Sequence, residues 1–409
     1  MKKTLLLGTT ALIAACVVTS GVVQAAEEPI TASVGGYFRS AMGFISQDNA
    51  DGEFANGNLS NALGNDIEIS VSGSTTLDNG ITAGFSAMIE GNASGASKDD
   101  SEALDERYVF FRGSFGQIQV GQHESARQQM TNFAPSGNYN FGVNTPFFIF
   151  GNPGNTAFEP FANVRTYDDG LGSEDGIKLI YFSPTFNGFR LGASYAPDDA
   201  FNGQYGGNTT DGLGALQNNA SVSAEFSNNF GDFNIRVMAG YETYKLETCN
   251  VNAAGTAVVA SFVTNLTPAR TTAPIIRTAA DQNCNDSPDS MQFGGTISFG
   301  EWAIGGGYLE SAQIGNTGTG AGRDREDFDL GIAWWSGAYG VGLMYGQAEL
   351  DDAAGLTDQF NLVELNGTYV LGPGIDVGAT IRKGEFDDAT AGGADNDFTS
   401  FAISAALNF

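Results

Sequence analysis

The chain has a single histidine, His123, and this is the one side chain whose ordinary pKa suits a general base near neutral pH. Nucleophilic catalysis would require a serine or cysteine held within hydrogen-bonding reach of that base. Ser125 is too near His123 in sequence to be an obvious partner, and no other group of residues forms a catalytic constellation. The sequence therefore favours a protein that is not an enzyme and that needs no cofactor.

Eleven charged residues lie instead at the polar positions of segments in which apolar side chains occupy most of every second position. Such side chains could line a water-filled interior without a large desolvation cost. Seven of the eleven are acidic, so an interior of this kind is expected to favour cations. The eleven positions are Arg39, Glu68, Glu90, Arg190, Glu225, Arg236, Asp327, Asp329, Glu364, Asp376 and Arg382.

The first 25 residues have the three-part layout of a secretory signal peptide. Lys2 and Lys3 precede an apolar run, and small residues lead to a cleavage site after Ala25. A lipoprotein signal is the alternative, because the residues before Cys16 resemble a lipid-attachment box. We expect a signal peptide over 1–25 and one domain over 26–409.

The composition of the remaining chain restricts its class. Cleavage leaves 16 of the 18 basic residues against 47 acidic ones, so the formal charge becomes 16 − 47 = −31. Nucleic-acid partners are therefore not expected, because they require positive patches. The 56 glycines, 30 phenylalanines and 13 tyrosines indicate strands and tight turns. No later apolar run reaches about 18 residues, which excludes a helical membrane protein.

Two cysteines remain after cleavage, Cys249 and Cys284. In an oxidising compartment we interpret them as one disulfide, with two unpaired thiols in a loop as the alternative. Acidic clusters such as 48–51, 324–329 and 387–388 could gather calcium, although most acidic loops only keep a surface hydrated.

Alternation of apolar with polar or very small side chains predicts sixteen strands. The links between them alternate between long and short, and the short ones carry Asn-Gly or single glycines that supply a positive φ. An even strand number, with tight turns at one end and long polar loops at the other, predicts an all-β fold, a 16-stranded antiparallel transmembrane β-barrel. The predicted strands are 31–46, 65–78, 80–92, 105–115, 116–123, 175–184, 187–197, 218–230, 231–246, 289–299, 301–312, 325–336, 338–350, 358–371, 374–386 and 397–409.

Aromatic residues cluster within a few positions of the short links, which predicts a belt of rings at one rim of the barrel. The last strand ends on Phe409, and barrel closure would pair it with the first strand. The predicted belt consists of Phe115, Phe186, Phe189, Phe230, Phe233, Phe299, Trp302, Trp335 and Tyr339.

Two hairpins resemble those of a known family. The sequence YFSPTFNGFRLGASYAPD from Tyr181 resembles the central hairpin of alphaproteobacterial general porins, within the Gram-negative porin superfamily. RYVFFRGSFGQIQVGQ from Arg107 resembles the hairpin before their pore loop, and Phe409 resembles their outer-membrane assembly signal. The resemblance implies a homotrimer in the outer membrane, in contact with lipid and lipopolysaccharide, and a third long loop folded inward to narrow each pore.

The third long loop, roughly 122–174, agrees with this resemblance on independent grounds. Its four prolines disfavour a strand, and its seven phenylalanines would be costly to expose. Members of the family place acidic groups of this loop opposite basic groups of the wall. Glu159, the only carboxylate between residues 125 and 167, is the candidate on the loop, and Arg39 and Arg382 are the candidates on the wall. Further pore candidates are Arg165, Arg190, Glu68 and Asp376.

These observations predict a cation-preferring diffusion channel for small hydrophilic solutes and ions. A channel selective for a sugar or an organic ion is the alternative, which the aromatic third loop favours. An adhesin or phage receptor would need large loops, and residues 247–288 allow that as a side role.

Overall fold

The computed structural model describes residues 29–47, 60–91, 104–144, 164–167, 176–198, 216–246, 288–314, 323–351, 356–387, 389 and 395–409. The predicted signal peptide, Glu159, Cys249, Cys284 and the acidic cluster at 48–51 lie outside these residues. Among the described residues, no helix is long and apolar enough to cross a membrane.

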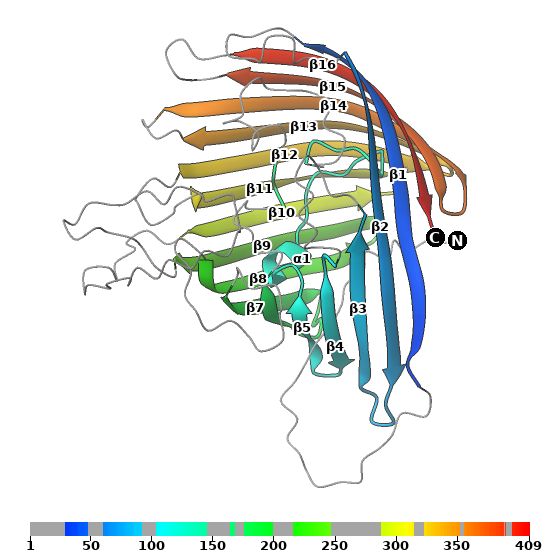
Figure 1. Cartoon of the computed structure of the whole chain (residues 1–409), viewed down its shortest axis with the longest axis vertical. Helices are drawn as coiled ribbons and strands as arrows, with labels where there is room; N and C mark the ends of the chain where they lie inside the picture. The colour runs from blue at the N-terminus through cyan, green and yellow to red at the C-terminus, as the bar shows by residue number, and fades with distance from the viewer. Residues whose placement is uncertain are drawn as a thin grey trace, which may run out of the picture.

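Sixteen antiparallel strands of the described chain form one closed barrel, in which each strand pairs with its neighbours in sequence and β1 pairs with β16 (Figure 1). The predicted fold class is confirmed. The strands are β1 (Thr31–Gln47), β2 (Asn61–Thr76), β3 (Thr82–Glu90), β4 (Arg107–Gly113), β5 (Gly116–Gln122), β6 (Ile177–Phe182), β7 (Phe189–Asp198), β8 (Leu216–Phe230), β9 (Phe233–Leu246), β10 (Asp289–Phe299), β11 (Trp302–Ile314), β12 (Arg323–Ser336), β13 (Tyr339–Asp351), β14 (Thr357–Gly372), β15 (Ile375–Asp387) and β16 (Asn396–Asn408), and α1 (Ala126–Gln129) follows β5.

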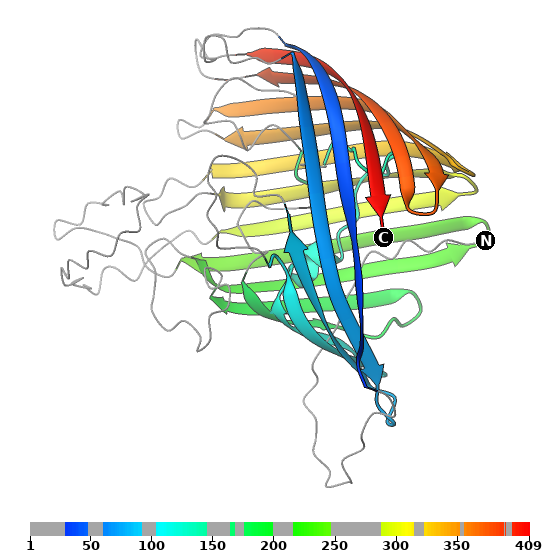
Figure 2. The same cartoon turned by 45° about the vertical axis from the view of Figure 1, so that its right-hand side comes forward.

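Barrel closure joins the two ends of the chain. Tyr37 of β1 lies opposite Asn408 of β16, and the backbone N–H of Phe409 donates to the carbonyl oxygen of Gly36 at 3.0 Å. Figure 2 shows β1 and β16 side by side, with the carboxy terminus at the end of β16. The barrel therefore has no open edge whose backbone groups would be left unpaired in lipid.

Each of the seven predicted short links contains a glycine with a positive φ, as in Gly116 at 98° and Gly231 at 63°. This backbone conformation is strained for residues with a Cβ, which explains the repeated glycine at these turns. The strand boundaries differ from the predicted ones by only a few residues. The largest shift is at β2, which begins at Asn61 instead of 65, because Asn61 still pairs with Phe44.

Side chains alternate sharply between the two faces of the wall. In β13, Leu343 is 50 % exposed, whereas its neighbour Met344 is 1 % exposed. Rows of exposed Leu, Ile, Val and Phe cover the outer face, which suits contact with lipid and would be unfavourable in water.

The predicted aromatic belt is largely present but loses one member. Phe186, Phe230 and Tyr339 are among the exposed rings near short turns, and Phe233 stacks on Phe299 at 4.7 Å between ring centroids. The assignment of Trp335 to the belt is wrong, because its Nε1–H donates to the carbonyl oxygen of Ser136 on the opposite, polar face. Nearness to a turn had suggested the belt, but the alternation along β12 decides the face.

Candidate functional site

The third long link begins after β5, and its described parts, residues 123–144 and 164–167, lie against the polar face of the wall. Hydrogen bonds join these parts to strands between β7 and β15. In Figure 1, α1 lies beside β8, and the cyan trace that follows it runs across β10, β11 and β12. These contacts place the described parts of the loop on the same face as the predicted pore-lining charges.

A fully buried ion pair fixes the base of the loop. Arg127 of α1 donates from Nε to Glu242 of β9 at 2.8 Å, and neither side chain is exposed to solvent. The same carboxylate accepts from Ser125 Oγ at 2.7 Å and from Asn219 Nδ2 at 2.7 Å. Because the buried charges are paired and further hydrogen-bonded, the cost of removing them from water is offset.

Asp329 of β12 connects the two ends of the loop. Its carboxylate accepts hydrogen bonds from the backbone N–H of Ala134 at 2.7 Å and from Asn144 Nδ2 at 3.2 Å. It also accepts from Thr166 Oγ1 and from the N–H of Gly307 on the neighbouring strand. One wall carboxylate therefore binds loop residues that precede and follow the segment 145–163.

Arg165 reaches the wall through its backbone. Its N–H donates to Asp327 Oδ1 at 2.8 Å, while Arg325 donates to the same carboxylate from Nε and Nη2 at 2.6 and 2.7 Å. The predicted site residue is thus part of the contact between loop and wall.

Arg382 is on the polar face, as predicted, and it is paired within the wall. It donates from Nε to Glu364 at 2.5 Å and from Nη2 to the loop carbonyl of Gly142 at 3.2 Å. Its guanidinium also lies 5.2 Å from the centroid of the Phe141 ring. Arg382 therefore supports the loop instead of projecting freely into solvent.

Arg39, Glu68 and Asp376 gather near the closure of the barrel. Arg39 pairs with Asp66 of β2, with Nε 2.9 Å from Oδ2, and stacks over the Tyr37 ring, whose hydroxyl donates to Glu68 at 3.0 Å. Asp376 accepts from the loop residue Asn140 at 3.2 Å. The strand register aligns Arg39 with Ala406 and Ala406 with Asp376.

Arg39 and Arg382 are not brought together. Arg39 aligns with Asp376 across β16, and Arg382 is six residues further along β15 than Asp376. At about 3.3 Å per residue, this offset is roughly 20 Å along the strand direction. The two candidate arginines therefore lie on the same face at different depths, because alternation determines the face of a residue and not its depth.

The polar face also carries an apolar cluster that the sequence did not predict. Met344, Phe360 and Leu362 are buried on this face and pack with Val143 and Val164 of the loop. Apolar packing therefore adds to the hydrogen bonds that hold the loop on β13 and β14.

Glycines of the wall allow the loop to approach closely. A Cβ on Gly294 of β10 would lie 1.8 Å from the carbonyl oxygen of Asn132, and one on Gly342 of β13 would lie 2.4 Å from the N of Gly137. Any side chain at these positions would push the loop away from the wall.

Comparison with protein families gives a match to the Gram-negative porin family over residues 8–389. The chain belongs to this family. The family and the barrel together point to an outer-membrane channel and not to an enzyme. No curated protein sequence matched.

Solved structures of the same fold span nearly the whole porin. The outer membrane channel DcaP of Acinetobacter baumannii has a TM-score of 0.58 at 13 % identity, covering 93 % of this chain and 97 % of that one. The trimer form of the outer membrane protein OmpT of Vibrio cholerae gives 0.57 at 13 % identity, covering 93 % and 100 %. An anion-selective porin from Comamonas acidovorans gives 0.55 at 14 % identity, covering 93 % and 100 %. At these identities the likeness concerns the fold.

The sequence had not singled out several residues that hold the loop of this porin. Arg127, Glu242 and Asn140 belong to this group, and Asp66, which pairs with Arg39 of the wall, was likewise not singled out. Glu242 and Asp66 occupy polar positions of predicted strands, so alternation alone could have found them. Arg127 and Asn140 lie in the loop, where no periodicity exists to indicate their partners.

Burial of acidic side chains limits the negative potential of this porin's polar face. Four of the seven acidic candidates, Asp327, Asp329, Glu364 and Asp376, are at most 4 % exposed and accept hydrogen bonds from the loop or from neighbouring wall side chains. Their charges are therefore largely committed to local partners. A simple count of acidic residues overstates the negative potential that a permeating ion would meet.

Glu124, beside the base of the loop, provides a test of pH dependence. Burial, followed by the negative charge of Glu106, raises the pKa of Glu124 from 4.5 to about 7. The folded state therefore binds an extra proton between these pKa values, and the stability this gives is lost as the pH rises through about 7. Glu124→Gln, which cannot ionise, should gain urea resistance relative to wild type between about pH 5 and pH 8. A stability difference that does not vary with pH would contradict this assignment.

Among the described residues, no group of three or more His, Cys, Asp or Glu side chains is placed to hold a metal ion. The acidic run at 324–329 is included in this statement, since it lies within β12. The geometry of this run therefore does not support a calcium site there.

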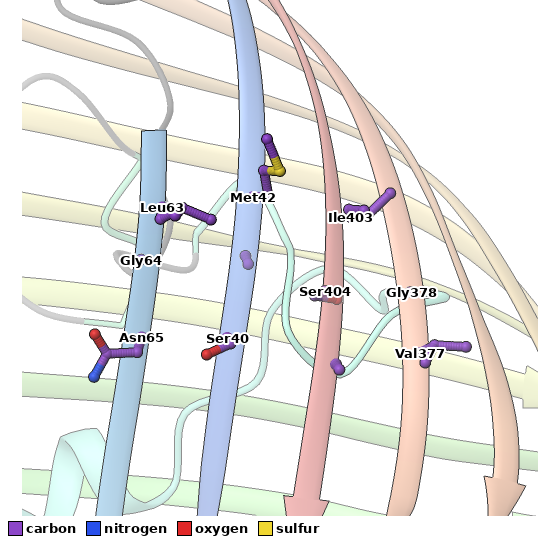
Figure 3. Close-up of a pocket in the computed structure, with 11 residues that line it drawn as sticks. Ser40, Met42, Leu63, Gly64, Asn65, Val377, Gly378, Ile403 and Ser404 are labelled. Atoms are coloured by element: carbon purple, nitrogen blue, oxygen red, sulfur yellow. The ribbon is translucent and has the colours of Figure 1, made fainter. Parts of the chain in front are cut away.

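A hollow of ≈ 690 Å³ lies on the wall where β15, β16, β1 and β2 meet (Figure 3). Ser40 and Asn65, which line it, lie opposite each other, and Met42 and Leu63 form the next pair of the same outer row. Polar residues thus interrupt the apolar outer row at this place.

Proposed function

We propose that this porin forms a water-filled diffusion channel for small hydrophilic solutes and ions, narrowed by its third loop. The observation that carries the proposal is the contact between that loop and the polar face of a closed barrel. The exposed face is apolar and suits lipid, so we infer that the polar face surrounds water and that the loop lies within the lumen. Its hydrogen bonds to β9, β12 and β15 would hold the constriction in place.

We further propose that the channel prefers cations. The 47 acidic residues exceed the 18 basic ones over the whole chain, and a strongly acidic surface raises the local concentration of cations at a pore mouth. Glu68 and Glu90, which are only partly buried and lie opposite each other in β2 and β3, would extend this effect inside the barrel. Glu159 of the loop is the proposed acidic group at the constriction.

Recording from planar bilayers tests both proposals. Stepwise conductance in potassium chloride is expected, with a reversal potential in a salt gradient that shows cation preference. Glu159→Gln should reduce that preference and leave the steps in place. Bilayers that stay closed would refute the channel, whereas open channels with an unchanged reversal potential in the variant would remove Glu159 from the constriction.

A channel selective for a sugar or an organic ion is the second candidate. The loop residue Tyr139 is 48 % exposed and packs at a tilt against Trp335 with 4.7 Å between ring centroids, so an aromatic surface faces the proposed lumen. Flat apolar rings with a hydroxyl at one edge suit ring-shaped solutes. Solute-induced block of the current by a neutral sugar would favour this candidate over general diffusion.

We propose that three copies assemble through the face that carries the hollow. Ser40 and Asn65 would be poorly placed against lipid tails, and a neighbouring copy could cover both. The resemblance to trimeric porins supports this assignment. Ser40→Trp, which fills the hollow, should convert trimers to monomers in mild detergent, as measured by size-exclusion chromatography. Val222→Trp, on the exposed outer face of β8, is the matched control and should stay trimeric. Equal assembly of both variants would place the interface elsewhere.

We also infer that residues 1–25 are removed on export, and that Cys249 and Cys284 then form a disulfide. Intact-mass measurement before and after reduction tests both inferences. A mature chain that begins at Ala26 and gains two hydrogen masses on reduction is expected.

A further inference from the structure

Two arginines lie beside one glutamate on the polar face of β7, β8 and β9. Arg190 lies directly opposite Glu225 in the pairing of β7 with β8, and Arg236 lies opposite Ser227, two residues further along β8. Side chains on one face of paired strands are close neighbours, with Cβ atoms about 5 Å apart when directly opposite. The three charged groups thus form one cluster with two positive charges and one negative charge.

Arg236 forms an ion pair with Glu225. It donates from Nε to Glu225 Oε2 at 2.6 Å, and its Nη2 lies 2.5 Å from the same oxygen. Its Nη2 also donates to the carbonyl oxygen of Met130 in the loop at 3.4 Å. The negative charge of Glu225 is therefore directed to Arg236, and Nη1 of Arg236 remains available.

Arg190 makes a different kind of contact. Its guanidinium lies 4.4 Å from the centroid of the Phe182 ring, and it forms no ion pair with any residue that the structure describes. Stacking on a ring occupies the flat face of a guanidinium and leaves its N–H edges free to donate. Phe182 is 1 % exposed, so it holds the arginine in a fixed orientation.

The cluster is reachable from the proposed lumen. The side chain of Arg236 is 35 % exposed and that of Glu225 is 14 % exposed, and Arg190 is partly exposed. Arg190 follows the short link at Gly188, and Arg236 follows the one at Gly231, so the cluster lies toward the short-turn end of the barrel. Short turns mark the periplasmic end of such barrels, and Met130 places the cluster beside the base of the loop.

We propose that Arg190 and Arg236 form a binding station for a small oxyanion, such as a carboxylate or a phosphate, on the periplasmic side of the constriction. A guanidinium fork matches the paired oxygens of either group, and one uncompensated positive charge favours an anion. Such a station would retain anions inside a barrel whose chain carries 47 acidic and 18 basic residues. It goes beyond the proposed diffusion function, which requires no binding.

Inorganic phosphate is the probe for this station. At constant ionic strength, phosphate is expected to reduce the single-channel current of the wild-type protein in a saturable way, and chloride is not. Arg190→Gln should weaken the apparent affinity for phosphate roughly tenfold to a hundredfold, the usual effect of losing a charge-assisted hydrogen bond. Arg190→Lys keeps the charge without the fork and should give an intermediate value.

Two further variants separate the station from general electrostatics. Arg112→Gln removes the same charge from an exposed arginine of β4 and should leave phosphate affinity unchanged. Glu225→Gln removes the competing carboxylate and should tighten phosphate binding. Acetate in place of phosphate shows which oxyanion binds better. Normal chloride conductance without any phosphate effect, or equal losses in the Arg190 and Arg112 variants, would overturn the inference and leave the channel intact, whereas the absence of conductance would refute the channel itself.

Discussion

Replacing Asp329 with alanine is expected to release the third loop from the wall and to increase single-channel conductance. The carboxylate accepts from the N–H of Ala134 and of Gly307, and from side chains at Asn144 and Thr166. Leaving the two backbone donors without an acceptor costs roughly 1–3 kcal/mol each, before the two side-chain bonds are considered. Because this residue holds both described ends of the loop, no other single wall substitution should have a larger effect on pore size.

Asp324→Ala is the matched control, since it removes the same charge from an exposed position of the same strand. Conductance should rise in the Asp329 variant and remain at the wild-type level in the control. Equal conductance in both variants would show that this carboxylate does not hold the constriction.

Replacing Arg127 with leucine is expected to lower the free energy of unfolding by about 3–5 kcal/mol, because it leaves a buried carboxylate without its cation. Glu242 and Arg127 are both fully buried. The double variant with Glu242→Leu removes both charges and should recover much of the loss. Urea unfolding of the refolded porin measures each effect.

Lys383→Leu provides the contrast, because its pair with Glu385 is exposed to solvent. Exposed ion pairs contribute little, so this variant should unfold close to the wild-type midpoint. If the double variant is no more stable than Arg127→Leu alone, the cost does not come from the unpaired carboxylate.

Local sequence rules predicted the wall of this porin well. Alternation and glycine-bearing turns depend on residues close together in the chain, so they identified all sixteen strands and the polar face that carries Arg39 and Arg382. The depth of each charge depends on strand tilt and on the stagger of the whole barrel, which no short segment determines. This is why alternation predicted the face of Arg39 and Arg382 but could not predict the distance between them.

The attachment of the loop could not be predicted for a related reason. Arg127 and Asn140 have no periodic neighbours, and their partners Glu242 and Asp376 are more than 100 residues away. Trp335 was also misplaced, although it lies in a strand. Its proximity to a turn suggested the outer rim, but its position in the alternation of β12 directs its side chain to Ser136 of the loop. Tertiary contacts of this kind can be identified only from the folded barrel.

The hydrogen bonds between the loop and the wall join residues that are far apart in the chain, and this affects the order in which the barrel can assemble. The loop residues Ser125, Ala134 and Asn140 find their partners 117, 195 and 236 residues later in the chain. Contacts between such distant residues form late, because a long segment must first be brought into place. We therefore expect an incomplete barrel to remain wide until its last strands are inserted. In the proposed channel, the pore would then reach its final diameter only when β15 and β16 close the ring, and only a completed molecule would select what it admits.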